Sequence, residues 1–145
     1  MEKIVFVCLG NICRSPMAEF VMKDLVEKAG NESKFLIESR ATSSWEHGNP
    51  IHSGTQTKLK EQKIAFDLHK GSQKISSEDF YEFDKIIAMD ESNLENLRKK
   101  APEGTRQKIA MLLEQGVPDP WFTGDFQETY QLVKTGCQRL LDEIV

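Results

Sequence analysis

The sequence predicts an α/β protein, a four-stranded parallel sheet with helices on both faces, in a single domain over residues 1–145. Short runs rich in Ile and Val alternate along the chain with segments of helical periodicity, which is the order of elements in such folds. The clearest runs are apolar at successive positions, as buried parallel strands are. With 39% hydrophobic and 29% charged residues, the chain is typical of a globular protein with one core.

The first strand, loop and helix follow one another directly. Residues 3–9 form an apolar run that ends at Gly10. Ser15 is placed to cap the following helix, and Pro16 suits the first position within it. Apolar residues then recur at helical spacing (Ala18, Val21, Met22, Leu25 and Ala29), and Gly30-Asn31 is expected to end the helix.

The next segment predicts a second strand and two helices. Residues 34–38 are the strand, and a long polar loop follows over residues 39–50. A mostly polar helix is expected over residues 54–63, followed by a short extended piece over residues 64–67. The sequence of residues 76–79, Ser-Ser-Glu-Asp, starts a further helix of one or two turns.

Two more strands are predicted on either side of a capped helix. Residues 85–89 are a third apolar run. Ser92 and Glu95 match a capping box, so a helix is expected to begin there and to stop before Pro102. Residues 108–113 fit a strand or a helix by periodicity, and the alternation of elements favours a fourth strand.

The last part of the chain combines an irregular loop with a long helix. Two prolines flank Asp119, so regular structure is not expected over residues 117–124. From Phe126 onward the apolar positions follow one face of a helix. They are Tyr130, Val133, Cys137, Leu140, Leu141 and Ile144.

Composition excludes several classes of function. A net charge of −4 does not supply the basic stripe that nucleic-acid binding needs. Three cysteines are too few for a disulfide scaffold, so a cytoplasmic protein is expected. No charged-then-apolar leader and no apolar run near the ~20 residues of a membrane span are found, so no membrane partner is expected. The Cys and His spacing does not match a structural zinc site, and neither a metal nor a cofactor is expected.

Residues 7–16 form a candidate anion site between the first strand and the first helix. The loop can turn its N–H groups inward, and the helix N-terminus adds positive charge. Arg14 offers a planar fork that matches two phosphoryl oxygens, and the same field favours a thiolate at Cys8. A structural cysteine at a strand end is the alternative. The residues expected to surround the anion are Leu9, Gly10, Asn11, Ile12, Cys13 and Ser15.

A thiolate that attacks a phosphoester needs an acid to protonate the departing oxygen. Asp119 is the best candidate, because it lies on a Pro-Asp-Pro turn beyond a strand end; an aspartate that only serves the turn is the alternative. Asp90 is the competing acid, although its place before a helix favours a capping or tethering role. Since the carboxyl ends of parallel strands share one edge, the loops with Cys8, Trp45, Asp90 and Asp119 are expected to converge.

Three aromatic residues follow the same strand ends. Trp45, Trp121 and Phe122 could wall a slot that is deep enough for an aryl phosphate and too deep for an alkyl phosphate. Their alternative role is to anchor the loops. The aromatic wall makes an aryl phosphate the expected substrate.

Of three further residues, His69 and Cys13 each fit two roles and Cys137 fits one. His69 could orient Asn11 or Ser15, and a structural or solvent-exposed histidine is the alternative. Cys13 could trap an oxidised Cys8 as a disulfide, or could simply be a small side chain. Cys137 belongs to the apolar face of the last helix, where a core position is expected.

Three stretches carry a resemblance to a known family: residues 8–16, 89–93 and 119–122. They closely resemble the low-molecular-weight protein tyrosine phosphatases, particularly the bacterial members, and the likeness covers essentially the whole chain. It implies a flavodoxin-like three-layer sandwich. It also implies that Cys8 is a nucleophile that forms a phosphocysteine, that Arg14 binds the phosphoryl group, and that Asp119 is the general acid and then the base.

The same likeness implies supporting residues and partners. Asn11, Ser15 and His69 fall where the family holds its loop together, and Cys13 falls where a protective disulfide with Cys8 can form. Phosphotyrosine-containing proteins are the implied substrates, and phosphate or another oxyanion is the implied loop ligand. We expect a monomer or a weak dimer.

Two features of the sequence bear on rival functions. Trp121-Phe122 stands where many members carry two phosphorylatable tyrosines, so regulation by phosphorylation is not expected there. Arginine phosphatases of the family resemble this loop but place Thr where Ile12 stands, and an apolar residue favours a flat aryl group. A non-catalytic anion-binding or redox-sensing module that uses Cys8 and Cys13 is a further alternative, against which Asp119 argues.

Overall fold

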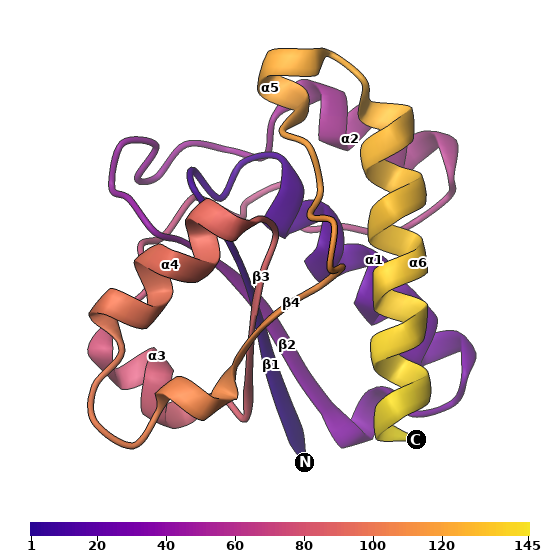
Figure 1. The fold of residues 1–145 in the computed structure, drawn as a ribbon. Coiled ribbons are helices and arrows are strands. Elements are labelled where there is room, and N and C mark those ends of the chain that lie inside the picture. The colour runs from indigo at the N-terminus through magenta and orange to yellow at the C-terminus, as the bar shows by residue number, and fades with distance from the viewer.

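The computed structural model describes residues 1–145, and its centre is one parallel sheet of four strands (Figure 1). The strands are β1 (Glu2–Cys8), β2 (Phe35–Ala41), β3 (Lys85–Ala88) and β4 (Ile109–Met111). Their order across the sheet is β2-β1-β3-β4. The chain therefore winds away from β1 in both directions, and in such sheets ligands bind beyond the carboxyl ends of the strands where the order reverses.

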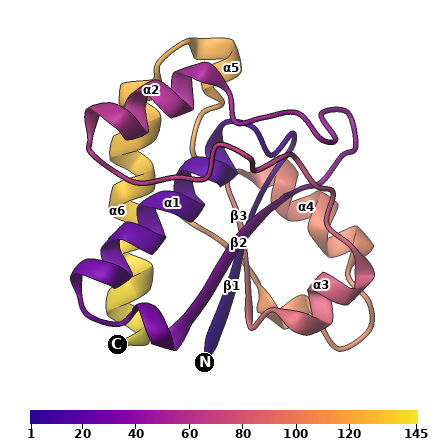
Figure 2. The same ribbon diagram turned by 180° about the vertical axis from the view of Figure 1, so that it is seen from behind.

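Helices cover both faces of the sheet, and the predicted fold class is confirmed (Figures 1 and 2). One face carries α1 (Arg14–Lys28) and α6 (Phe126–Ile144), with α2 (Ser53–Glu61) packed against both. The other face carries α3 (Ser77–Glu82) and α4 (Glu91–Lys100). Short helical turns complete the fold: η1 (Glu32–Lys34), η2 (Arg106–Lys108) and α5 (Pro120–Thr123). None of the helices is long and apolar enough to cross a membrane.

Strand β1 divides the core because its side chains alternate between the two faces. Ile4 and Phe6 pack with α1 and α6, whereas Val5 and Val7 pack with α3 and α4. All four side chains are fully buried. This explains why the strand is apolar at successive positions, and it makes β1 the fixed base from which the next loop starts.

Most predicted elements are confirmed, with ends that shift by a few residues. The capping box at Ser76 is present, with Asp79 as its partner, and the helix from Phe126 runs to Ile144. The short extended piece expected at residues 64–67 does not pair as a strand. The chain there is irregular and follows Lys63, which has a left-handed φ of 58°.

Two predictions about helix starts are also wrong. Helix α1 begins at Arg14 without a side-chain cap, and Ser15 lies inside its first turn. Helix α4 is capped by Asp90 rather than Ser92, because the Asp90 carboxylate accepts the Asn93 N–H at 2.8 Å. Residues 117–124, predicted to be irregular, include α5, since Asp119 caps it and proline is favourable at the first helical position.

Strand β2 extends three residues beyond its predicted end. The backbone of residues 73–75 runs parallel to the strand end and pairs with it, as Ala41 donates to Gln73 O and accepts from Ile75 N, both at 2.8 Å. Ser39 and Arg40 are thereby buried beside the end of β1. The extension brings polar side chains behind the loop that follows β1.

Candidate active site

The loop between β1 and α1, residues 9–13, turns its carbonyl groups outward. Asn11 adopts a left-handed φ of 56°, which asparagine tolerates better than most residues. Hydrogen bonds from the surrounding chain hold five carbonyl oxygens: Thr42 N to Cys8, Ser43 N to Leu9, Ser72 Oγ to Gly10, His52 N to Ile12, and Thr55 Oγ1 to Cys13. These carbonyls are therefore satisfied by three separate segments of the protein, residues 42–43, Ser72 and the start of α2.

The N–H groups of the loop are turned the opposite way. The Asn11 N–H donates to Cys8 Sγ at 3.3 Å. The remaining four donate to no protein atom: Leu9, Gly10, Ile12 and Cys13. Successive free N–H groups just before a helix N-terminus form a concave, positively polarised site for an anion. We call this arrangement the anion cradle.

Cys8 is the last residue of β1 and is only 3% exposed. Its sulfur lies 3.1 Å from Ser15 Oγ. The Ser15 hydroxyl also accepts from Asn11 Nδ2 at 2.7 Å and donates to the Arg40 carbonyl at 3.3 Å; rotated away from that carbonyl, it would donate to the sulfur of a Cys8 thiolate. A hydroxyl and a backbone N–H beside the sulfur both stabilise negative charge on it.

Arg14 is 3% exposed and is held from three sides. Its Nη1 donates to Asp90 at 2.7 Å and to the Val117 carbonyl at 2.9 Å, and its Nη2 lies 3.4 Å from an Asp119 oxygen. Burial alone would lower the pKa of Arg14, but Cys8, Asp90 and Asp119 together raise it above its ordinary value. The guanidinium is thus permanently charged, and Asp90 both tethers it and caps α4.

Asp119 faces Cys8 across a cavity of about 200 Å³. The carboxylate caps α5 by accepting the Trp121 N–H at 3.1 Å, and its side chain is 23% exposed. The cavity is lined by Cys8, Leu9, Gly10, Ile12, Cys13, Arg14, Trp45, Glu46, Asp119, Trp121 and Phe122. Apart from Glu46, all of these residues were singled out from the sequence.

The aromatic residues form the outer part of this cavity. Trp45, Trp121 and Phe122 are 79%, 58% and 80% exposed, far more than aromatic residues that anchor a core. Glu46, which the sequence analysis missed, lines the same wall and accepts a hydrogen bond from Asn49 at 2.6 Å. Only its neighbour Trp45 could have drawn attention to it.

Asn11 and Ser15 lie behind the cavity, in a buried polar network. Asn11 donates to Ser15 and Ser39 and accepts the Gln73 N–H at 3.1 Å. Ser39 in turn donates to Glu19 at 2.6 Å. A continuous row of hydrogen bonds thus leads from the Cys8 sulfur to the carboxylate of a helix α1 residue.

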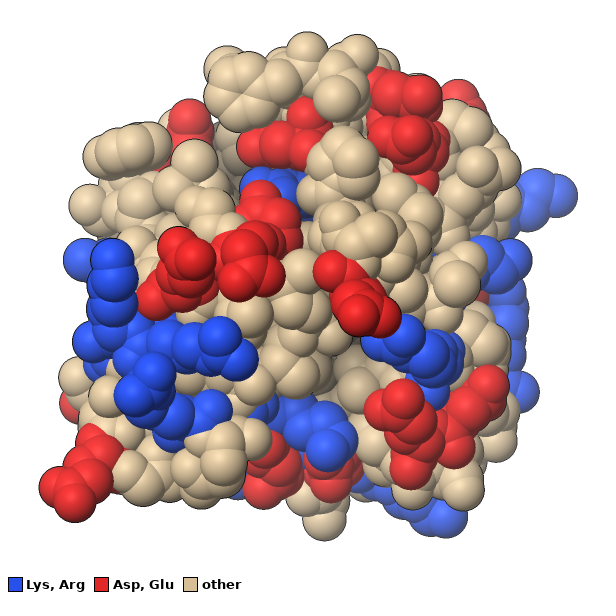
Figure 3. Space-filling model, viewed as in Figure 1, with Lys and Arg blue, Asp and Glu red and all other residues tan.

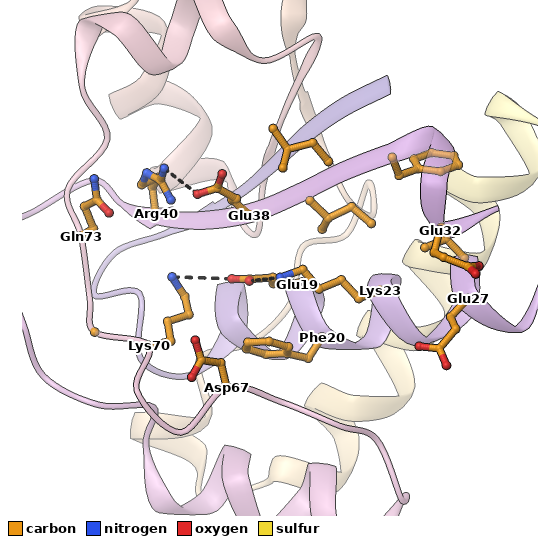
Figure 4. A pocket seen from close by; sticks show the side chains of 15 residues that line it. Glu19, Phe20, Lys23, Glu27, Glu32, Glu38, Arg40, Asp67, Lys70 and Gln73 are labelled. Atoms are coloured by element: carbon orange, nitrogen blue, oxygen red, sulfur yellow. Dashed lines mark hydrogen bonds and ion pairs between the residues drawn. The ribbon is translucent and has the colours of Figure 1, made fainter. Parts of the chain in front are cut away.

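Glu19 ends this network at a second cavity, which is lined by α1, β2 and residues 67–73 (Figure 4). Lys23 Nζ lies 2.7 Å and Lys70 Nζ 3.6 Å from its carboxylate oxygens. Burial lowers the pKa of Lys70, and the neighbouring Glu19 partly offsets this effect. The two lysines compensate the charge of a carboxylate that is 5% exposed.

The prediction that His69 orients Asn11 or Ser15 is wrong. His69 is exposed, and its ring makes no hydrogen bond to either residue. The adjacent Lys70 reaches inward instead, to Glu19 and to the Ser39 carbonyl at 3.3 Å. Side-chain direction in an irregular segment has no period, so the sequence could not distinguish these two neighbours.

The other two cysteines differ from Cys8 in their surroundings. Burial, with the negative charges of Cys8 and Asp119 nearby, raises the pKa of Cys13 to about 12. Cys137 is fully buried in the core, and burial raises its pKa as well. All three cysteines are free thiols. No three His, Cys, Asp or Glu side chains come together in a way that could hold a metal ion.

His52 is a further residue that the sequence analysis missed. Its N–H holds the Ile12 carbonyl at 2.8 Å, and its ring Nδ1 accepts the Gly54 N–H at 2.9 Å, which caps α2. The ring stacks on Phe126 at 5.2 Å and meets Trp121 edge-on at 5.6 Å, measured between centroids. His52 therefore joins the anion cradle, through its backbone N–H, to the Asp119 loop, through its ring.

The site combines a thiol beside a cradle of N–H groups with a buried arginine and an aspartate across the cavity. This combination is typical of the cysteine-dependent phosphatases, and it assigns the protein to that class. The sequence profile of one family, described as "Low molecular weight phosphotyrosine protein phosphatase", matches residues 3–145. The chain belongs to this family.

Individual relatives agree with the family assignment. YfkJ of Bacillus subtilis, named a low molecular weight protein-tyrosine-phosphatase, is 45% identical over 151 residues, which cover 99% of this chain and 96% of YfkJ. The crystal structure of SP-PTP, a low molecular weight protein tyrosine phosphatase from Streptococcus pyogenes, superposes with a TM-score of 0.95. The two sequences are 55% identical, and the match covers 100% of this chain and 94% of SP-PTP. The crystal structure of DARP, a drosophila arginine phosphatase, superposes with a TM-score of 0.88. The two sequences are 32% identical, and the match covers 99% of this chain and 98% of DARP.

Two replacements of His52 separate its role as the α2 cap from the contact of its ring with Trp121. His52→Asn retains an acceptor for the α2 cap and His52→Ala does not, so the free energy of unfolding in urea should be about 1 kcal/mol lower for His52→Ala than for His52→Asn. Both variants lose the ring beneath Trp121. In a Trp45→Phe background, which leaves Trp121 as the sole tryptophan, both should shift the emission to longer wavelength. Unchanged emission would show that His52 does not support the Asp119 loop.

Proposed function

We propose that this protein hydrolyses phosphotyrosine in proteins, and other aryl phosphates, through a phosphocysteine intermediate formed on Cys8. The observation that carries the proposal is the anion cradle, whose four free N–H groups lie beside the Cys8 sulfur. A phosphoryl group bound there places its phosphorus against the nucleophile. We also propose that residues 1–145 form one domain, which contains all of the groups that this reaction requires.

In the first step the Cys8 thiolate attacks phosphorus, and the bond from phosphorus to the tyrosine oxygen breaks. The cradle and Arg14 hold the three phosphoryl oxygens, which carry the charge in the transition state. Asp119, protonated, gives its proton to the departing phenolic oxygen. The products are a phosphocysteine and a neutral tyrosine.

Substrate binding itself prepares Asp119 for this role. In the structure Arg14 Nη2 lies 3.4 Å from the Asp119 carboxylate. A phosphoryl group bound in the cradle competes for that donor, which releases the Asp119 side chain from Arg14. Asp90 and the Val117 carbonyl continue to hold the other side of the guanidinium.

In the second step a water molecule attacks the phosphocysteine. Asp119, now a carboxylate, takes a proton from the water, and phosphate leaves as the bond from sulfur to phosphorus breaks. The sulfur departs as a thiolate, and the Ser15 hydroxyl at 3.1 Å is placed to stabilise it. Asp119 ends the cycle protonated, so the enzyme is restored.

The aromatic rim supports an aryl substrate. Trp45, Trp121 and Phe122 line the cavity together with the cradle, and their aromatic faces can pack against a phenyl ring, which a short alkyl chain does not offer. The three free cysteines suit a reducing compartment, so we place the protein and its phosphoprotein substrates in the cytoplasm.

Cys8→Ser tests the proposal. Without the thiolate, hydrolysis of para-nitrophenyl phosphate should fall by at least about 10⁴-fold, the scale seen when a covalent nucleophile is removed. The cradle remains, so the variant should still bind a phosphotyrosine peptide, measured by fluorescence anisotropy. Retained turnover would exclude the phosphocysteine mechanism. Loss of both binding and turnover would point instead to a damaged loop.

Asp119→Asn tests the general acid while keeping a side chain that can cap α5. Turnover of an aryl phosphate with a poor leaving group should fall by about 10²–10⁴-fold, and turnover of para-nitrophenyl phosphate should fall much less, because that phenol needs no proton to leave. Asp125→Asn, at the cap of α6 and outside the cavity, is the matched control. Equal slowing across a leaving-group series would assign the acid to another residue.

Phosphoarginine is a second candidate substrate, and Glu46 is the observation that favours it. A carboxylate in the cavity wall would pair with a guanidinium, and the similar DARP structure is that of an arginine phosphatase. The apolar Ile12 opposes this reading, since it favours a flat aryl ring. We therefore rank phosphotyrosine first.

Ile12→Thr measures this preference. The ratio of kcat/KM for phosphotyrosine to that for phosphoarginine should exceed one in the wild type and fall by about tenfold or more in the variant, the scale of one altered contact in a pocket. Ile12→Val is the conservative control and should leave the ratio near the wild-type value. A wild-type ratio below one would make phosphoarginine the substrate.

A further inference from the structure

Six basic residues gather at the C-terminal end of α4 and the turn that follows it. Figure 3 shows the concentration of Lys and Arg over these elements, on a surface that is elsewhere mixed or acidic. The six are Lys74, Arg98, Lys99, Lys100, Arg106 and Lys108. We call them the α4 basic patch.

None of the six is neutralised by a carboxylate within 4.0 Å, whereas most of the other cations have such a partner. The charge is therefore available to a partner. Such a concentration of positive charge is unusual for this protein. The patch holds six of its 19 basic residues, and the rest of the chain has 13 basic residues against 23 acidic ones.

Structural roles account for part of the patch only. Cations in the last turn of a helix stabilise its dipole, which explains Arg98 and Lys99, and Lys108 caps carbonyl groups at the end of α3. Lys74 and Arg106 lie outside both helices. Burial and the charge of Lys74 lower the pKa of Lys100, so these two residues are close enough to repel each other.

The patch adjoins the wall of the candidate active site. Lys74 lies on the segment that pairs with Ala41, and Lys100 Nζ donates to the Thr42 carbonyl. The same segment is bonded to the strand end and loop that form the cradle, since Thr42 N donates to the Cys8 carbonyl and Ser43 N to the Leu9 carbonyl. A peptide that leaves the cavity over residues 42–44 would meet the patch next.

We propose that the α4 basic patch binds acidic residues flanking the phosphotyrosine of a protein substrate. This inference rests on the proposed function, because it names the substrate class of that site. A flexible acidic segment can contact the patch alone. A nucleic acid or an anionic bilayer is a broad polyanion, and it would also meet other parts of a protein in which acidic residues outnumber basic ones, 23 to 19.

The test compares Lys74→Glu/Lys99→Glu with Lys34→Glu/Lys60→Glu, which reverses two exposed lysines that also lack ion-pair partners and lie away from the patch. Each pair is combined with Cys8→Ser for binding and is assayed alone for turnover. The probes are two phosphotyrosine peptides that differ only in having Glu or Gln at the flanking positions. Neither pair touches the cavity, so turnover of para-nitrophenyl phosphate should be unchanged in both.

The unmodified patch should bind the Glu peptide about tenfold more tightly than the Gln peptide at low salt, the product of several exposed ion pairs that each give a factor of about two. The preference should shrink as NaCl is raised, vanish in Lys74→Glu/Lys99→Glu and persist in the control. An absent preference, or one that survives the patch variant, overturns the proposal. Binding of duplex DNA or phosphatidylserine vesicles, lost in the patch variant without any peptide preference, overturns it in favour of those partners.

Failure of the proposed function has a different signature. Wild-type protein that does not hydrolyse para-nitrophenyl phosphate would refute the phosphatase activity. The binding comparison between the two peptides does not depend on turnover, so it decides the role of the patch separately.

Discussion

The orientation of the peptide groups in residues 9–13 is the constraint on which the rest of the site depends. Each N–H can face the cavity only if its neighbouring carbonyl finds a donor elsewhere, because a buried carbonyl without one costs about 1–3 kcal/mol. The protein supplies donors from residues 42–43, from Ser72, and from the start of α2. The free donors of the cradle therefore exist because distant segments satisfy the acceptors.

The same constraint explains the polar interior behind the loop. Asn11 holds a left-handed conformation, and its side chain is fixed by Ser15, Ser39 and the Gln73 N–H. Such a buried network is stabilising only when each member is paired, which is why Ser39 continues to Glu19 and Glu19 to two lysines. Cys8 thus sits in a preorganised environment that no single side chain provides.

Sequence patterns predicted best where one physical signal dominates. The apolar runs located the strands. The succession of strand, loop and helix around Cys8 located the candidate anion site, because periodicity identifies the elements and chain direction fixes their order. The sequence predictions failed where several residue types fit one role. Ser15 fits a helix cap by type, yet its hydroxyl faces the Cys8 sulfur. His69 was expected to orient Asn11 or Ser15, yet the adjacent Lys70 is the residue that reaches inward, to Glu19. His52 and Glu46 were missed because neither belongs to a local motif.

The sequence by itself determined the order of elements and predicted that Cys8, Arg14 and Asp119 line one cavity, since residue type and spacing carry that information. The tertiary structure decided which side chains support them. Contacts such as Arg14 with Val117, or His52 with Ile12 and Trp121, join segments that are far apart in the chain. They arise from packing around the sheet, and no pattern along one segment can specify a partner that another segment supplies.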